Sequence, residues 1–243
     1  MNPKEPDFVP VYFKLQRMLL EEVENGSWKP GEIIPSEKEI AEAHHVSIGT
    51  VKKAVLNLVN EGYLFRIQGK GTFVAGTTIT GERLRYYRFL THFNANEAEI
   101  QIRFLNLKII KCPQGVHSYL KINPKDKVYE IERIVFYRMK PIVYTISYLP
   151  QKMFMGLEEF SKIRFEKIPL YISLEEKYGL PTIFNQELIS AVKAESYPAK
   201  MLGIRKGTNV LLIEMLAFTY KEQRCEYRVS YCRTDRKKLF REI

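Results

Sequence analysis

Hydroxyl, ammonium and amide side chains gather in two short stretches near the start of the chain. One stretch is Ser47-Ile48-Gly49-Thr50-Val51-Lys52-Lys53, and the other is Arg66-Ile67-Gln68-Gly69-Lys70. Lysine and arginine neutralise phosphates, while hydroxyl and amide groups hydrogen-bond to phosphates or base edges. Gly49 and Gly69 carry no side chain and so permit close approach. These residue types suit contact with a nucleic acid, although a lysine pair by itself is more often a solvated surface.

The histidines and cysteines show no pattern of a catalytic or metal centre. His92 and His117 are isolated, and the neighbours His44 and His45 cannot both face one ion from a helix. No CxxC pair occurs among Cys112, Cys225 and Cys232. P-loop, GxSxG, HExxH and GxGxxG patterns are absent. We therefore expect no enzyme activity, no metal, no cofactor and three reduced thiols.

Three helices are expected to position the first stretch. Apolar residues recur at helical spacing over 11–23 and again over 51–59. Ser36-Glu37-Lys38-Glu39 has the form of a capping box, whose serine accepts an amide proton and whose last glutamate reaches back. Ser47 can cap the third helix in a similar way. A short helix, a tight turn and a third helix form a helix-turn-helix, which can lay the third helix in the major groove of DNA.

A hairpin is expected to position the second stretch. The β-prone runs 63–66 and 72–74 flank a turn with two glycines around a lysine. A slim cationic tip of this kind suits the narrow minor groove. The residues that this winged helix-turn-helix would bring to DNA are Ser47, Ile48, Gly49, Thr50, Lys52, Lys53, Arg66, Gln68, Gly69 and Lys70.

The chain changes character after residue 77. β-rich runs fall at about 100–111, 127–137, 141–149, 183–193, 209–220 and 224–233. Helical stretches fall at about 114–121, 169–178 and 196–202. Strands that neighbour one another as hairpins, with helices between them, predict an α+β domain with an antiparallel sheet. We place a DNA-binding domain at 1–76, a linker at 77–90 and a second domain at 91–243.

Composition and charge indicate where the protein is located and how its first domain could bind DNA. No apolar run approaches the roughly 18 residues that a membrane span needs, and residues 1–7 lack the apolar core of a signal peptide. We therefore expect a soluble cytoplasmic protein. The net charge is +10, yet residues 1–76 carry 9 basic and 10 acidic side chains. The first domain would thus bind DNA through a local patch and not through bulk charge.

Four motifs in order resemble the GntR family of bacterial transcription regulators. They are Pro35–Ala41, Val46–Ala54, Glu61–Leu64 and Gln68–Val74. The resemblance implies that the first domain binds operator DNA and that Lys38 holds a phosphate. Ile48, Lys52 and Ile67 stand where the family usually has arginines, so the operator is expected to differ from the family's common sequence. Ile48 can instead meet a thymine methyl group.

Later motifs resemble the UTRA effector-binding domain, which marks the HutC-type branch of that family. They include Glu132–Val135, Lys140–Ile142, Leu170-Tyr171, Glu175–Gly179 and Cys225–Tyr227 with Arg233–Arg236. The resemblance implies a chorismate-lyase-like fold without that enzyme's chemistry, a dimer, and a small-molecule ligand. The effector-binding positions that it implies are His92, Arg133, Thr145, Tyr171, Glu226 and Arg233.

Several of these positions depart from the family pattern. His92 and Thr145 replace a serine and an acid, Pro169 and Cys232 replace a serine and a tyrosine, and Val135 replaces a second arginine. Because an acid is lost and no second guanidinium is expected, the departures favour a singly charged anion over a doubly charged sugar phosphate. The alternative for Arg133 is an ion pair on the surface or between strands.

The sequence thus predicts a homodimeric, ligand-responsive repressor that binds double-stranded operator DNA and is released by a small anionic metabolite. Two alternatives remain open at this point. One is a regulator with a vestigial pocket that acts through protein contacts. The other is an enzyme acting on a small anion with the chorismate-lyase-like fold.

Overall fold

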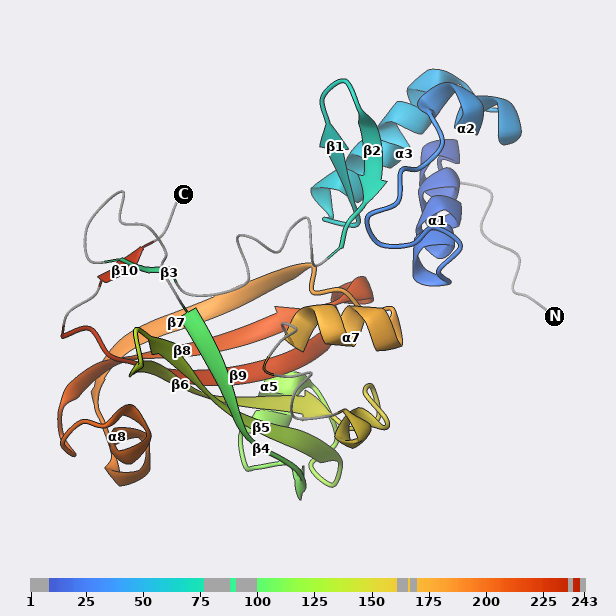
Figure 1. Ribbon diagram of the computed structural model, residues 1–243. Helices are drawn as coiled ribbons and strands as arrows, with labels where there is room; N and C mark the ends of the chain where they lie inside the picture. Colours follow the sequence, from blue (N-terminus) through green and yellow to red (C-terminus); the bar gives the residue numbers. More distant parts are fainter. Residues whose placement is uncertain are drawn as a thin grey trace.

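A helical unit and a large antiparallel sheet make up the chain (Figure 1). The computed structural model describes residues 9–76, 88–90, 100–160, 166, 170–235 and 238–240. The helical unit comes first in the sequence, and the six strands of the sheet contain nearly half of the remaining described residues.

Three helices form the core of the first unit. They are α1 (Val11–Glu24), α2 (Glu37–Ala43) and α3 (Ile48–Asn60). The capping box at Ser36 and Glu39 is formed, and the Ser47 hydroxyl caps α3. Gly62, which follows α3, has a φ of +79°, a conformation that glycine adopts without strain. The buried faces of the helices meet in one apolar cluster.

A two-stranded wing completes this unit. Strands β1 (Leu64–Ile67) and β2 (Gly71–Val74) pair antiparallel, and Ile33 forms an isolated bridge to Phe73. The turn between the strands holds Gly69 at a φ of +74°. The winged helix-turn-helix expected from the sequence is therefore confirmed.

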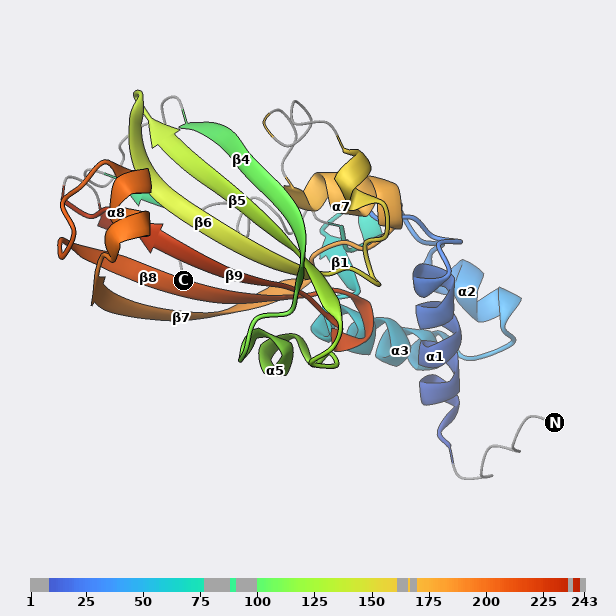
Figure 2. The same cartoon turned by 90° about the horizontal axis from the view of Figure 1, so that it is seen from below.

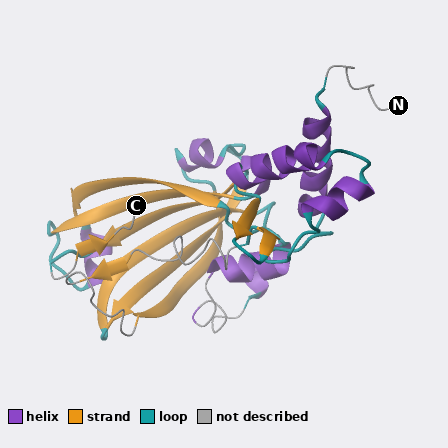
Figure 3. Ribbon diagram, turned by 90° about the horizontal axis from the view of Figure 1, so that it is seen from above, coloured by secondary structure: helices purple, strands orange, loops and turns teal. Residues whose placement is uncertain are grey.

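The second unit is built on a six-stranded antiparallel sheet in the order β4-β5-β6-β9-β8-β7. The strands are β4 (Ile100–Lys111), β5 (Lys127–Tyr137), β6 (Lys140–Pro150), β7 (Phe184–Lys193), β8 (Asn209–Phe218) and β9 (Arg224–Cys232). Figure 3 shows the strands gathered in this sheet, with the three helices of the first unit to one side of it. The α+β architecture is confirmed.

Helices cover both faces of the sheet (Figure 2). α7 (Leu170–Tyr178) and the 3-10 turn η1 (Leu157–Glu159) pack on one face, over an apolar cluster that includes Tyr129, Ile131 and Met215. α5 (Val116–Leu120) and α8 (Ser196–Leu202) pack on the other face. Because side chains alternate along a strand, each position of the sheet faces one of these two layers.

The structure corrects one expected strand and adds two more. Strand β8 ends at Phe218, and residues Tyr220–Glu222 form the 3-10 turn η2 instead of continuing the strand. Lys221 and Glu222 adopt left-handed φ values of 57° and 51°, which lie outside the β region, so the chain turns here. Short strands β3 (Arg88–Leu90) and β10 (Lys238–Phe240) pair with each other, so the end of the expected linker is a strand.

Among the helices that the structure describes, none has the length and apolar character needed to cross a bilayer. The described residues also hold no group of three or more histidine, cysteine or acidic side chains placed to bind a metal ion.

Candidate functional site

The start of α3 presents a mixed polar and apolar surface. The Ser47 hydroxyl accepts a hydrogen bond from the Thr50 amide at 3.1 Å, and the two hydroxyl oxygens lie 2.9 Å apart. Ile48 is 47% exposed, although it is apolar, and Gly49 beside it is exposed. An exposed isoleucine at the start of a recognition helix can contact a thymine methyl group. Ser47 therefore has a capping role as well as its expected place at the DNA.

Lysines on α3 diverge in direction. Lys52 lines an open groove of about 900 Å³ together with Lys38, Lys70 and Ile48. The Lys53 ammonium instead lies 3.9 Å from the centre of the Tyr12 ring on α1. A cation over an aromatic face is held there by the ring quadrupole. The structure thus brings Lys38, Lys52 and Lys70 together and directs Lys53 away from them.

Acidic side chains that also line the groove are engaged locally. Glu39 accepts from the Ser36 amide at 2.7 Å, and the Ser36 side chain lowers the pKa of Glu39. Glu32 accepts from the Lys29 amide at 2.9 Å, and Glu37 pairs with Arg66 at 2.7 Å. Lys38 also lies 3.9 Å from Glu42 Oε1, but both side chains are largely exposed, and an exposed pair of this kind is weak enough to exchange for a phosphate.

The wing presents fewer cations than the sequence suggested. Arg66 lies within β1, opposite Thr72, and its guanidinium pairs with Glu37. Gln68, Gly69 and Lys70 form the exposed turn at the tip. A Cβ atom built at Gly69 meets nothing within 4 Å. The expected tip therefore consists of Gln68, Gly69 and Lys70, and Arg66 supports it from the base.

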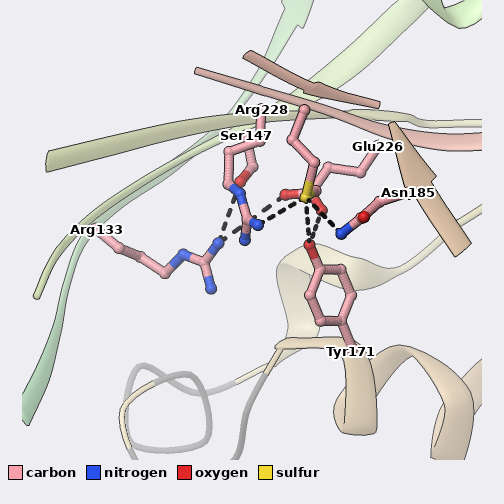
Figure 4. A network of polar contacts seen from close by, with 7 residues as sticks. Arg133, Ser147, Tyr171, Asn185, Glu226 and Arg228 are labelled. Carbon is pink, nitrogen blue, oxygen red and sulfur yellow. Dashed lines mark hydrogen bonds and ion pairs between the residues drawn. The ribbon is translucent and has the colours of Figure 1, made fainter. Parts of the chain in front are cut away.

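A second cluster of polar side chains is buried on the face of the sheet that α7 covers. Arg133 on β5, Thr145 on β6 and Ser230 on β9 are direct neighbours across three strands. Arg133 and Thr145 are 5% and 6% exposed, and Glu226 is fully buried. Tyr171 reaches the same place from α7 (Figure 4). Four of the six residues expected at the effector site therefore share one buried region.

Hydrogen bonds connect these groups. The Tyr171 hydroxyl donates to Glu226 Oε2 at 2.6 Å. Arg133 Nη2 donates to Ser147 Oγ at 3.1 Å and lies 4.0 Å from Glu226 Oε1. Burial raises the pKa of the Tyr171 phenol well above its ordinary value, so the hydroxyl remains a donor. Arg133 is thus buried beneath α7, and its contact with Glu226 joins β5 to β9, as in the inter-strand ion pair that was the alternative for this residue.

A second guanidinium in this region comes from Arg228, which sequence reasoning missed. Arg228 is 6% exposed, its Nη2 atom lies 2.8 Å from Met215 Sδ, and its guanidinium carbon is 5.6 Å from the centre of the Tyr171 ring (Figure 4). Asn185 reaches the same sulfur from β7 at 3.4 Å. The alternation of side chains along β9 is the signal that was available, because Arg228 lies two residues from Glu226 and so shares its face.

Several polar atoms of this region have no hydrogen-bond partner among the described residues. They are Arg133 Nε, Thr145 Oγ1, Ser173 Oγ, Ser230 Oγ and Glu226 Oε1. Buried polar atoms in proteins nearly always have partners, and each exception calls for an explanation. Donors and acceptors that converge in this way can bind a polar ligand. We refer to Arg133, Thr145, Tyr171, Glu226 and Arg228 as the effector site.

The remaining expected positions lie elsewhere. Arg233 follows the end of β9, donates to the Leu202 carbonyl of α8 and pairs with Asp235, so it belongs to the opposite face. Val135 and Cys232 belong to a separate apolar cluster. His92 and Pro169 are outside the described residues. The structure therefore does not bring Arg233 together with Arg133 and Glu226.

Comparisons with known proteins agree with this geometry. Residues 12–74 match the description "Bacterial regulatory proteins, gntR family", and residues 95–238 match the UTRA domain. The chain is 28% identical over 214 residues to the HTH-type transcriptional regulator YurK of Bacillus subtilis, covering 88% of this chain and 87% of that protein. It is 26% identical over 236 residues to the HTH-type transcriptional repressor NagR of the same organism, covering 97% and 96%.

A solved structure shows the same fold for the second unit. The crystal structure of a GntR-family ligand-binding domain from Bordetella bronchiseptica superposes with a TM-score of 0.60 at 24% identity, covering 66% of this chain and 99% of that one. The named relatives are transcriptional regulators and not enzymes. The chain is a helix-turn-helix transcription regulator that belongs to the gntR family, in the HutC-type branch that carries a UTRA domain.

Proposed function

We propose that this regulator is a homodimeric cytoplasmic repressor that leaves its operator when a small anion occupies the effector site. The observation that carries the proposal is the pair of buried guanidinium groups, Arg133 and Arg228, on one face of the sheet. The carboxylate of Glu226 lies beside them, with its Oε1 atom 4.0 Å from Arg133 Nη2 (Figure 4). An anionic ligand would accept hydrogen bonds from both guanidinium groups, which converge on one buried region beneath α7.

Arg228 changes the expected ligand. Val135 supplies no guanidinium, so a singly charged acid was the expectation from the sequence. With Arg133 and Arg228 both present, a doubly charged group such as a phosphate monoester is favoured, because each guanidinium can offer parallel donors. The hydroxyls of Thr145, Ser173 and Ser230, which have no partner among the described residues, would suit hydroxyl groups on the rest of the ligand. The proposed effector is therefore a hydroxylated phosphate ester.

Operator binding is proposed through α3 and the wing. Lys38, Lys52 and Lys70 would contact phosphates, and Ile48, Gly49 and Thr50 would face the bases. Two winged units in a symmetric dimer would read the two halves of a near-palindromic operator. We place the boundaries of the DNA-binding domain, linker and effector domain at 1–76, 77–90 and 91–243. NagR, a relative over nearly the whole chain, is named as a repressor, which supports repression.

A ligand screen with two readouts tests the proposal. The full chain is melted with matched sets of phosphate esters, monocarboxylates and amines, and compounds that raise the melting temperature are added to the protein–operator complex. We expect phosphate esters to stabilise the protein and release the DNA. Stabilisation by amines alone would contradict the anionic site. Operator release without any stabilising compound would favour a vestigial pocket and regulation through protein contacts.

A further inference from the structure

The winged unit touches the effector domain of its own chain through a defined surface. We call this surface the interdomain contact; it consists of Glu24, Gly62, Tyr63, Ile183, Tyr220 and Lys221. The rings of Tyr63 and Tyr220 stack with centres 5.8 Å apart and planes 12° apart. The Lys221 amide donates to the Tyr63 hydroxyl at 2.7 Å, and the Lys221 ammonium pairs with Glu24 at 2.5 Å. Aromatic stacking, a hydrogen bond and an ion pair thus join the two units.

Packing extends across the same surface. Ile183 and Tyr220 come from the effector domain, yet both belong to the apolar core of the winged unit and are 8% and 6% exposed. A Cβ atom on Gly62 would lie only 3.0 Å from Ile183 Cγ2, so glycine allows the close approach of the backbone. The contact therefore continues the core of the winged unit into the effector domain.

Other features of the interdomain contact destabilise it. The Tyr220 hydroxyl and Glu24 Oε1 are buried without a hydrogen-bond partner among the described residues. Lys221 and Glu222 hold left-handed φ values, which are costly for residues other than glycine. Release of the contact would allow water to reach both atoms. An interface that combines stabilising and destabilising interactions in this way is suited to opening and closing.

Helix α7 and the residue pair that follows it connect this contact to the effector site. Tyr171 on α7 donates to Glu226 in the effector site. Leu180, two residues beyond the end of α7, packs against both the apolar cluster under α7 and the core of the winged unit. Glu175 on α7 lies 3.0 Å from the position that a Cβ on Gly76 would occupy, directly after the wing. One short segment therefore touches ligand-binding groups and the DNA-binding unit.

We propose that the interdomain contact is a latch that holds the winged unit against its own effector domain, and that α7 adjusts the latch in response to the effector site. Closure fixes the orientation of α3 relative to the sheet. A ligand that changes the Tyr171–Glu226 bond shifts α7 and Leu180, and so changes the fraction of latched molecules. The regulatory meaning of the latch rests on the proposed function, but its existence does not.

Two intrinsic probes allow the latch to be tested in the full chain without ligand or DNA. The single tryptophan, Trp28, packs against the core of the winged unit. Of the 15 tyrosines, 13 lie beyond residue 76. Tryptophan fluorescence therefore reports melting of the winged unit, and tyrosine near-ultraviolet circular dichroism mainly reports the effector domain.

The first test inverts one charge and then restores the pair. Lys221→Glu should lower the Trp28 melting midpoint by about 2–6 °C and leave the tyrosine midpoint unchanged. The double variant Glu24→Lys with Lys221→Glu should recover at least about half of that shift. Lys200→Glu, an exposed charge inversion on α8, is the matched control and should have no effect on Trp28. An unchanged Trp28 midpoint in Lys221→Glu, or no recovery in the double variant, would overturn the latch.

The second test addresses α7 through hydrogen exchange of residues 61–76. Tyr171→Phe removes a tyrosine–glutamate bond at α7, and Tyr227→Phe removes a similar bond to Glu214 on the opposite face of the sheet. We expect Tyr171→Phe to speed exchange in 61–76 by about threefold or more, and Tyr227→Phe to leave it unchanged. Equal exchange in the two variants would overturn the role of α7. Neither test involves effector or operator, so failure here is distinct from failure of the proposed function.

Discussion

Lys52 and Lys53 are adjacent in sequence, but their side chains have different neighbours. Lys52 lines the groove with Lys38 and Lys70, while Lys53 lies over the Tyr12 ring. We expect Lys52→Ala and Lys70→Ala each to lower the slope of log affinity against log salt by about 0.9, the value for one lost phosphate contact. Lys53→Ala should change the slope much less. Titration of fluorescent operator DNA with each variant at several salt concentrations measures the slope.

Lys53→Ala is the matched control in that experiment, because it removes the same charge from the neighbouring position. Equal slopes for the Lys52 and Lys53 variants would show that the groove does not follow the DNA backbone. The same measurement with a scrambled duplex separates phosphate contacts from base contacts, since a lost phosphate contact weakens both complexes alike.

The arginines of the second unit also differ in where their side chains lie. Arg133 and Arg228 are buried beneath α7, while Arg233 pairs with Asp235 beside α8. A charge-assisted hydrogen bond contributes about 1.5–3 kcal/mol, so Arg133→Ala and Arg228→Ala should each raise the effector dissociation constant by about tenfold to a hundredfold. Calorimetry with a stabilising phosphate ester on the full chain is the measurement.

Arg233→Ala serves as the control for these two variants and should bind the effector like the parent. Removal of Arg133 also takes away the cation that lies 4.0 Å from Glu226 Oε1, so each variant is first compared with the parent by thermal melting. If Arg233→Ala loses affinity while Arg133→Ala does not, the effector binds on the other face of the sheet.

At the scale of elements, the wing depends on one backbone conformation. Gly69 has a φ of +74° and open space around its Cβ position. A β-branched residue is strained at this φ, by about 1–3 kcal/mol, so Gly69→Val should reshape the tip and weaken operator binding by at least about tenfold. The melting temperature should stay within a few degrees, because a Cβ at Gly69 meets no described residue within 4 Å.

Gly69→Asn separates shape from bulk at the same position. Asparagine tolerates a left-handed φ, so it keeps the turn while adding a side chain. Loss of operator binding in Gly69→Asn would indicate that the groove wall approaches Gly69 closely. Normal binding by both variants would contradict the entry of the wing into the minor groove. An electrophoretic mobility shift assay at a fixed salt concentration measures operator binding by both variants.

The capping box of α2 provides a second test at this scale. Ser36→Ala removes the N-cap and should destabilise the winged unit by about 1 kcal/mol, as measured by Trp28 fluorescence in urea. The Ser36 hydrogen bonds hold the pKa of Glu39 below its usual 4.5. A lowered carboxyl pKa stabilises the fold above the unfolded pKa, and this benefit disappears as the pH falls through the lowered value. The difference in the free energy of unfolding between the parent and Ser36→Ala should therefore shrink below about pH 4.5. A difference that stays constant with pH would show that Glu39 is not involved.

For the whole molecule, charge and symmetry lead to one prediction. The first 76 residues have a net charge of −1, so a single winged unit offers only the local patch of Lys38, Lys52 and Lys70 to DNA. Two units on one duplex double those contacts. We expect two chains per operator in native mass spectrometry, and a half-operator should bind at least about a hundredfold more weakly than the full one. One chain per operator, or equal affinity for the half-site, would contradict the dimer.

Local sequence determined the elements of this protein. The capping box at Ser36, the cap at Ser47, the apolar spacing on α3 and the glycine turn at Gly69 each act within a few residues, so the winged helix-turn-helix could be predicted from them. Alternating β-rich runs likewise predicted an antiparallel α+β domain. The resemblance to a known family then brought Arg133, Tyr171 and Glu226 together, which spacing alone did not.

Tertiary structure decided which side chains meet. Period-two alternation assigns Glu226 and Arg228 to one face of β9 but does not reveal that this face lies opposite Tyr171 on α7. The end of β9 at Cys232 turned Arg233 toward α8, away from the effector site. Long side chains take directions set by neighbours that are distant in sequence, and the pairing of Lys221 with Glu24 exists only because two units pack together. Elements follow from interactions within a few residues, whereas sites depend on contacts between residues far apart in the chain.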